Sequence, residues 1–167
     1  MAIGPVQMLI VGFDGPEFKG EILDELTRLK DADIIRLIDL VVVKKDDEGN
    51  IETLHTSDLD EDAALEFGAV AGALIGLGYA GEEGAEAGAM AGAEAMADGR
   101  VFDDDQVWYA ADAIPNGTAA GVALIEHRWA IPLRDAIIRA NGIPLVDEWI
   151  HATDLMAVGV ATAEATA

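Results

Sequence analysis

The segment FGAVAGALIGLGYAGEEGAEAGAMAG, residues 67–92, has a glycine at every fourth position on both sides of Ala80. Folding the chain at Ala80 would set Gly76 against Gly84, Gly72 against Gly88, and Gly68 against Gly92. In a helix, residues four apart share one face, and each glycine costs roughly 0.5–1 kcal/mol relative to alanine. Close approach of two backbones compensates for that cost. The spacing therefore predicts two antiparallel helices packed as a glycine zipper.

Outside this segment, short apolar runs alternate with amphipathic ones. Apolar runs bounded by turn residues predict strands at residues 6–13, 34–45, 51–56, 119–126 and 143–150. Helical spacing or an acidic start predicts helices at residues 17–30, 103–113 and 129–140. We expect Ser57 or Asp58 to cap the first arm of the glycine-rich hairpin, because their side chains accept from free N–H groups at a helix start.

Without the hairpin, the main elements read strand, helix, strand, then strand, helix, strand. This order predicts an α+β fold, a ferredoxin-like double βαβ sandwich with an inserted Gly/Ala-rich antiparallel helical hairpin. The expected domains are residues 1–57 and 100–156 for the ferredoxin-like part, 58–99 for the hairpin and 157–167 for a flexible tail. A doubly wound parallel sheet would need more strand and helix pairs than this length leaves.

Several blocks of the sequence also resemble a known family. They are GPVQMLIVGFD, GEILDELTRLK, the glycine-rich segment and DQVWYAADAIPNGTAAGVALIEHRWAIPLRDAI. These blocks resemble an uncharacterised bacterial family, domain of unknown function 6325, over about residues 4–155. The layout is similar to that of a larger glycine-rich family often described as membrane protein of unknown function. The resemblance implies this layout and no particular reaction.

The chain is strongly acidic, with 32 Asp and Glu residues against 10 Lys and Arg residues and a net charge of −22. Nucleic-acid binding needs clustered Lys and Arg, so no nucleic-acid partner is expected, and anionic lipid surfaces are disfavoured as well. The chain has no cysteine, which excludes disulfides and thiol chemistry. The first residues lack the basic start of a signal peptide. We expect a cytoplasmic protein whose acidic surface keeps it soluble.

Three stretches of two kinds invite a ligand and are better explained as turns and caps. Residues 76–81, GLGYAG, match the dinucleotide-binding pattern, but they follow a run with helical glycine spacing, and Glu82 would lie beside a pyrophosphate. The acidic runs at residues 46–50 and 103–105 lack the ligand spacing of an EF-hand loop. We therefore expect no cofactor and no metal.

The histidines give only a weak candidate site. His55, His127 and His151 lie far apart in the sequence and lack metal-ligand spacing. His127 and His151 would end neighbouring predicted strands, so His127, Trp129 and His151 are candidates for a small-molecule, metal or acid–base site. Structural or surface roles are the simpler interpretation. Because no nucleophile motif is present either, we expect no enzyme.

The first arm of the hairpin is apolar on more than its glycine face, and one partner helix cannot cover all of it. We therefore expect a non-enzymatic scaffold that forms a homo-oligomer through the hairpin. The expected interface consists of Phe67, Gly68, Val70, Gly72, Leu74, Ile75, Gly76, Gly84, Gly88, Met90 and Gly92. Met96 should add an adaptable contact from the second arm.

Two other functions stay open at this point. The first alternative is a membrane-associated protein whose hairpin packs in or on the bilayer. Its longest uncharged run, residues 67–81, is shorter than the roughly 20 residues of a spanning helix. The second alternative is a ligand or metal site near His127 and His151.

Overall fold

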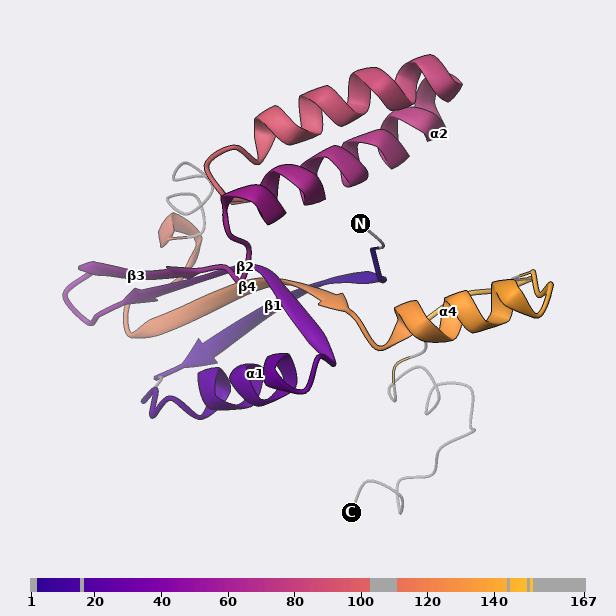
Figure 1. Ribbon diagram of the computed structural model, residues 1–167. Coiled ribbons are helices and arrows are strands. Elements are labelled where there is room, and N and C mark those ends of the chain that lie inside the picture. The colour runs from indigo at the N-terminus through magenta and orange to yellow at the C-terminus, as the bar shows by residue number, and fades with distance from the viewer. Residues whose placement is uncertain (1–2, 16, 103–110, 144, 150, 152–167) are drawn as a thin grey trace. The chain divides into compact units, whose positions relative to one another are not determined.

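The computed structural model describes residues 3–15, 17–102, 111–143, 145–149 and 151. The chain divides into two units, Met1–Leu133 and Arg134–Ala167. Its elements in chain order are β1 (Val6–Asp14), α1 (Glu21–Asp31), β2 (Ile35–Lys45), β3 (Ile51–Thr56), α2 (Glu61–Ala95), β4 (Thr118–His127) and α4 (Ala130–Arg139) (Figure 1). The predicted α+β class is confirmed. Most of the predicted helix at residues 103–113 and the predicted tail at 157–167 lie outside the described residues.

The sheet has four strands in the order β1-β4-β2-β3, and every neighbouring pair is antiparallel. β1 and β2 therefore run in the same direction on either side of β4. The two central strands are the most buried. Seven residues of β2 are buried, five of them consecutive, which is typical of a strand covered on both faces, and five residues of β4 are buried, mostly at alternate positions. All four strands coincide with strands that the sequence predicts.

The strand predicted at residues 143–150 is wrong, because none of the described residues in that range belongs to a strand. Pro144 has no N–H group to donate to a strand ladder, and Asp147 and Glu148 interrupt the apolar run. β4 already pairs on both sides, with β1 and with β2. The fourth strand of the described sheet is β3 instead, so the strand expected to follow α4 is not part of this sheet.

The two faces of the sheet are covered by different helices. Leu26 and Leu29 of α1 pack on a cluster of sheet residues that includes Leu37 and Ile125. The base of α2 packs on the other face, where Phe67 belongs to a separate cluster. Figure 1 shows α1 and α2 on opposite sides of the sheet. A ferredoxin-like sandwich keeps its helices on one side, so this arrangement differs from the expected one.

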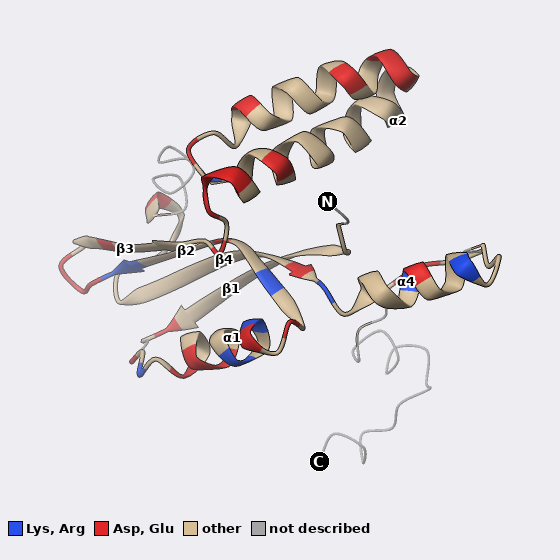
Figure 2. Cartoon of the chain, viewed as in Figure 1, with Lys and Arg blue, Asp and Glu red and all other residues tan. Residues whose placement is uncertain are grey.

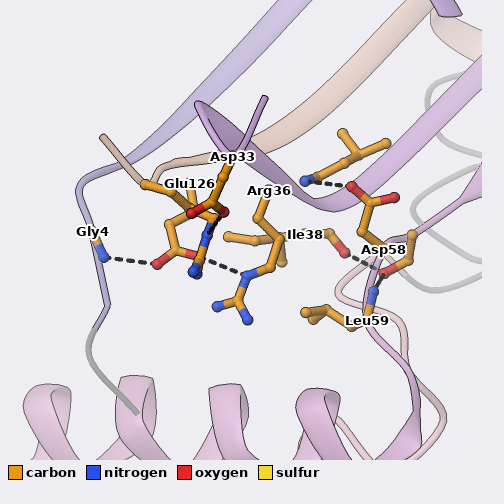
Figure 3. Close-up of polar contacts among 10 residues, drawn as sticks. Gly4, Asp33, Arg36, Ile38, Asp58, Leu59 and Glu126 are labelled. Carbon is orange, nitrogen blue, oxygen red and sulfur yellow. Dashed lines mark hydrogen bonds and ion pairs between the residues drawn. The ribbon is translucent and has the colours of Figure 1, made fainter. Parts of the chain in front are cut away.

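A β-bulge in β2 lets one strand serve both clusters. The pairing with β4 shifts between Leu37 and Asp39, which makes Ile38 the extra residue. The segment after β3 binds the backbone of the bulge. The Leu37 N–H donates to the Asp58 carboxylate at 3.0 Å, and Ser57 Oγ donates to the Ile38 carbonyl at 2.6 Å (Figure 3). These two side chains therefore secure the bulge instead of capping α2 as expected.

The N-cap of α2 is Asp60, whose side chain accepts from the Ala63 N–H at 2.8 Å. The helix is broken at Ala80 and at Gly81, which has φ 65° and ψ −148°. That backbone conformation is essentially open to glycine alone. The chain reverses there, and the two arms lie side by side (Figure 1).

The glycines of the two arms meet in the pairs that their spacing predicts. A Cβ atom added to Gly72 would lie 2.0 Å from the Gly88 carbonyl oxygen, and one added to Gly76 would lie 1.9 Å from that of Gly84. Gly68 and Gly92 form the third pair, with a corresponding distance of 2.1 Å. No side chain fits at these distances, so the arms approach each other only because these residues are glycine.

In the second part of the chain, α4 ends as expected at the Asn141–Gly142 dipeptide. Asn141 has a φ of 58°, and the Gly142 N–H donates to the Ile137 carbonyl at 2.8 Å. This left-handed residue with its backward hydrogen bond is a common way for a helix to end.

Candidate functional site

The hairpin leaves several large apolar side chains exposed. The glycine faces are turned toward each other, and several large side chains on the other faces of the arms remain exposed. Ile75 is 75% exposed and Tyr79 is 93% exposed. We define the outer hairpin residues as Leu74, Ile75, Leu77, Tyr79 and Met90, all of which are exposed. Apolar groups gathered in this way mark an interaction surface in many proteins.

Charge divides the hairpin into two unlike arms. The first arm carries acidic residues only near its base, and no charged residue stands between Glu66 and Glu82. The second arm carries Glu82, Glu83, Glu86 and Glu94 along its length. Figure 2 shows this difference: the first arm is red only near its base, whereas the second arm has red positions along its length. The uncharged arm is therefore the side at which an apolar contact is least opposed by charge.

The structure narrows the interface expected from the sequence. Phe67 is buried in the cluster at the base of α2, and the six zipper glycines face one another within the chain. Met96 is also buried there instead of offering an external contact. Of the expected interface residues, those left on the outside are Leu74, Ile75, Met90 and the half-buried Val70.

A buried carboxyl group organises the polar contacts below the hairpin. The side chain of Asp39 is fully buried, and its Oδ2 accepts from the N–H groups of Val101 at 2.7 Å and Phe102 at 2.9 Å. Its Oδ1 lies 2.5 Å from Nε2 of His55. Asp39 thus joins β2, β3 and the segment that follows α2. The sequence analysis missed this role, although an acidic residue inside an apolar strand is a usual sign of a partnered buried carboxyl group.

Next to His55 lies a cavity of about 330 Å³. Its lining includes Ser57, Glu61, Asp98 and Arg100, so both charge signs are present. The residues that the structure describes contain no group of three or more His, Asp or Glu side chains able to hold a metal ion. The cavity could admit a small polar molecule, but its mixed lining favours no ligand class.

Glu126 is the second fully buried acidic residue, and its contacts are structural. Its carboxylate accepts from the Gly4 N–H at 2.8 Å and from Arg36 Nε at 2.6 Å (Figure 3). The guanidinium of Arg36 lies 5.8 Å from the ring centroid of Phe67. This chain of contacts connects the N-terminal segment, the two central strands and the base of the hairpin.

The expected histidine site is not assembled in the first unit. His127 and Trp129 do lie close together, with ring centroids 6.4 Å apart. Both ring nitrogens of His127 are engaged, since Nε2 lies 3.0 Å from the Gln7 side chain and Nδ1 accepts from Trp129 at 3.4 Å. His151 belongs to the second unit. A site built on all of these residues therefore stays a prediction.

Comparisons of the chain with protein-family models, with curated proteins and with solved structures find no match. The resemblance to domain of unknown function 6325 stays a prediction from the sequence blocks.

Proposed function

We propose that the protein is a non-enzymatic cytoplasmic scaffold that assembles into a homo-oligomer through its outer hairpin residues. One observation carries this proposal: the glycine faces of the two arms pack against each other within the chain, and large apolar side chains on their other faces are exposed. Burying such side chains stabilises an assembly by about 25 cal/mol per Å² of apolar surface. A second copy of the same hairpin offers a matching surface.

The charge distribution favours a second copy at this surface. Each chain carries a net charge of −22, so two copies repel one another over most of their surfaces. The uncharged run at residues 67–81 is where that repulsion is weakest. Association through the same residues on both partners gives a closed symmetric assembly. Added salt screens the remaining repulsion between copies and should therefore strengthen the assembly.

The test is the mass of the full-length protein in solution without detergent, measured by light scattering and native mass spectrometry at low and high salt. We expect an oligomer that the double substitution Leu74→Glu, Ile75→Glu converts to a monomer. The matched control is Ile138→Glu, an exposed isoleucine of α4, which should leave the assembly unchanged. A wild-type monomer at high protein and salt concentrations would rule the proposal out.

A membrane-associated hairpin is the second candidate, supported by the length and apolar composition of α2. Within the described residues, this one helix is long and apolar enough to cross a membrane. Its break at Ala80 and Gly81 shortens each arm, however. At about 1.5 Å per residue, the uncharged run spans roughly 20 Å, less than the roughly 30 Å of a hydrocarbon core. Such a hairpin would enter the bilayer only partly.

Flotation with vesicles of zwitterionic phosphatidylcholine distinguishes the two candidates. The scaffold proposal expects the oligomer to stay in the aqueous fraction. Flotation of the wild-type protein, lost in the Leu74→Glu, Ile75→Glu variant, would favour the membrane candidate.

For the fold, we propose a variant of the double βαβ arrangement. Helix α1 connects β1 to β2, which are parallel and lie on either side of β4. The α2 hairpin connects β3 to β4, which are parallel and lie on either side of β2. These interlocked units support a relation to ferredoxin-like sandwiches in which the glycine-rich hairpin takes the place of the second helix. An experimental structure with a strand order other than β1-β4-β2-β3 would contradict this relation.

A further inference from the structure

A cavity of about 670 Å³ lies between the first half of α1 and the sheet. Its walls are mostly apolar and come from α1 with the segment before it and from all four strands. They include Phe13, Phe18, Leu23, Val42 and Ala123. The volume lies within the roughly 300–1,000 Å³ of typical small-molecule sites. This cavity is on the face of the sheet opposite the hairpin.

The cavity exists because α1 covers the sheet unevenly. Leu26 and Leu29 pack on the core, whereas Ile22 is half exposed and α1 has no fully buried residue. On the cavity floor, β4 contributes the small residues Gly121 and Ala123. A Cβ atom added to Gly121 would have no neighbour nearer than 3.8 Å. The apolar walls therefore stay in contact with water, which favours an apolar occupant.

Two lysines line the same cavity. The chain has only 10 Lys and Arg residues against 32 acidic ones, and Lys19 and Lys44 are both part of this lining. Among the described residues, the side chain of neither lysine makes a hydrogen bond or an ion pair. By contrast, Arg28, Lys30 and Arg36 each contact a carboxylate.

Carboxylates are also present at the cavity. Glu17, Glu21 and Glu52 belong to its lining, and Glu52 stands directly opposite Lys44 in the pairing of β2 with β3. No ion pair forms between Glu52 and Lys44. Both lysines thus keep their side-chain donors for an external anion, unlike Arg28, Lys30 and Arg36.

We propose that this cavity binds a single-chain fatty acid. The apolar tail lies between α1 and the sheet, and the carboxylate accepts hydrogen bonds from the ammonium groups of Lys19 and Lys44. An anionic head complements the lysines, and the tail removes the exposed apolar walls from water. A second copy of this acidic chain fits the site less well, because it would bring a net charge of −22 toward Glu17, Glu21 and Glu52.

The first experiment titrates dansyl-labelled undecanoic acid, below its micelle concentration, into the full-length protein. We expect a saturable rise in dansyl fluorescence that corresponds to one probe per chain. Palmitate should displace the probe, whereas dodecyl maltoside and dodecyltrimethylammonium, which share the tail but lack the anionic head, should not. Equal displacement by all of these compounds would overturn the proposal, because the lysines would then have no role.

The second experiment compares matched variants. The double substitution Lys19→Glu, Lys44→Glu should weaken probe binding by about tenfold or more, which corresponds to about 1.4 kcal/mol. Arg139→Glu is the control, since it also reverses a cation with no ion pair among the described residues but does not line the cavity. It should leave the affinity unchanged. Unchanged affinity in the lysine variant as well would contradict the proposal.

Filling the cavity tests the tail site separately. Gly121→Ile adds a branched side chain to the cavity floor, where an added Cβ atom meets Val42 and Phe13 only at 3.8–3.9 Å and where strands favour such residues. We expect loss of probe binding without loss of thermal stability. Full retention of binding in a folded Gly121→Ile variant would show that the probe binds elsewhere. A probe affinity that falls as the protein concentration rises would assign the cavity to a second copy, and this too would overturn the proposal.

Discussion

α1 and the α2 hairpin cover opposite faces of one sheet, and they pack in opposite ways. The arms of α2 touch at backbone distance, as the 2.0 Å separation between a Cβ atom added to Gly72 and the Gly88 oxygen shows. α1 carries large side chains over the small floor residues of β4 and leaves a cavity of about 670 Å³. In α2, small residues on both arms face each other, and the two helices approach to backbone contact. Below α1, the small residues Gly121 and Ala123 face large side chains of the helix, and a cavity remains between them.

The strongest test of this comparison is a side chain inside the zipper. Gly72→Leu would force the arms apart, since even its Cβ atom would meet the backbone of Gly88. We expect a loss of about 4 kcal/mol in the free energy of unfolding, at the upper end of overpacking effects, measured by urea denaturation.

Gly78→Ala provides the control within the same helix. An added Cβ atom there has no neighbour within 4 Å, so the substitution should raise stability by up to about 1 kcal/mol through helix propensity alone. If Gly72→Leu were tolerated as well as Gly78→Ala, the close contact between the arms would be disproved.

The base of the hairpin depends on a buried polar residue, Asp39, whereas the ion pair of α1 with Asp58 is exposed on the lysine side. Asp39→Ala leaves the partly buried N–H groups of Val101 and Phe102 without their acceptor and removes the contact with His55. We expect a loss of about 3 kcal/mol in the free energy of unfolding. Amide hydrogen exchange at Val101 and Phe102 should accelerate more than exchange in α1. Asp39→Asn, which keeps one carbonyl acceptor, should lose less, and an equal loss would show that shape alone is required.

Sequence patterns were sufficient where the deciding interactions are local. The spacing of glycines about Ala80 predicted which residues oppose one another, because helical geometry and a single reversal determine those pairs. The ends of β2, β3 and β4 likewise followed from turn residues. The predicted cap at Ser57 or Asp58 failed, since both side chains bind the bulge of β2 and Asp60 caps the helix.

Features that depend on distant contacts or on empty space were not predicted. No turn residue or glycine marks Ile38 as the extra residue of β2, so the change of face in that strand was not predicted. The apolar run at residues 143–150 resembles a strand, but it could join the sheet only if a strand of the sheet had an unpaired edge next to it, and β4 already pairs on both sides. The cavity below α1 arises where Gly121 and Ala123 carry too little side chain, and no motif marks that absence.

Substitutions in α1 should show a smaller and graded response. Leu26 is half-buried against the core cluster, whereas Ile22 is 50% exposed beside the cavity. We expect Leu26→Ala to lower the free energy of unfolding by about 1.5 kcal/mol, below the usual range for a fully buried leucine, and Ile22→Ala by less than about 0.5 kcal/mol. Urea denaturation of both variants measures the difference. Equal losses would mean that α1 lies flat on the sheet and that the cavity is closed in solution.

The weakest contact that holds α1 is an ion pair at its end. The dependence of stability on pH shows whether this ion pair stabilises the fold. Lys30 Nζ lies 2.6 Å from Asp58 Oδ1, and the hydrogen bond to Asp58 raises the pKa of Lys30 above its ordinary value. Because the folded-state pKa is the higher one, the contribution is fully present below the unfolded pKa, near 10.4, and is lost as pH rises through the folded pKa. The pair is half exposed, so we expect it to contribute only about 0.5 kcal/mol.

Urea unfolding of wild type and Lys30→Met from about pH 7 to about pH 11 measures this contribution. The stability difference between the two proteins should shrink toward zero at the alkaline end and should also shrink in high salt. Arg28→Met is the matched control: Arg28 pairs with Glu25 inside α1, and this pair raises the pKa of an arginine that already stays charged throughout this range. Its stability difference should therefore stay flat with pH. A flat profile for Lys30→Met as well would show that the contact with Asp58 adds nothing to holding α1, which would then be fixed by Leu26 and Leu29 alone.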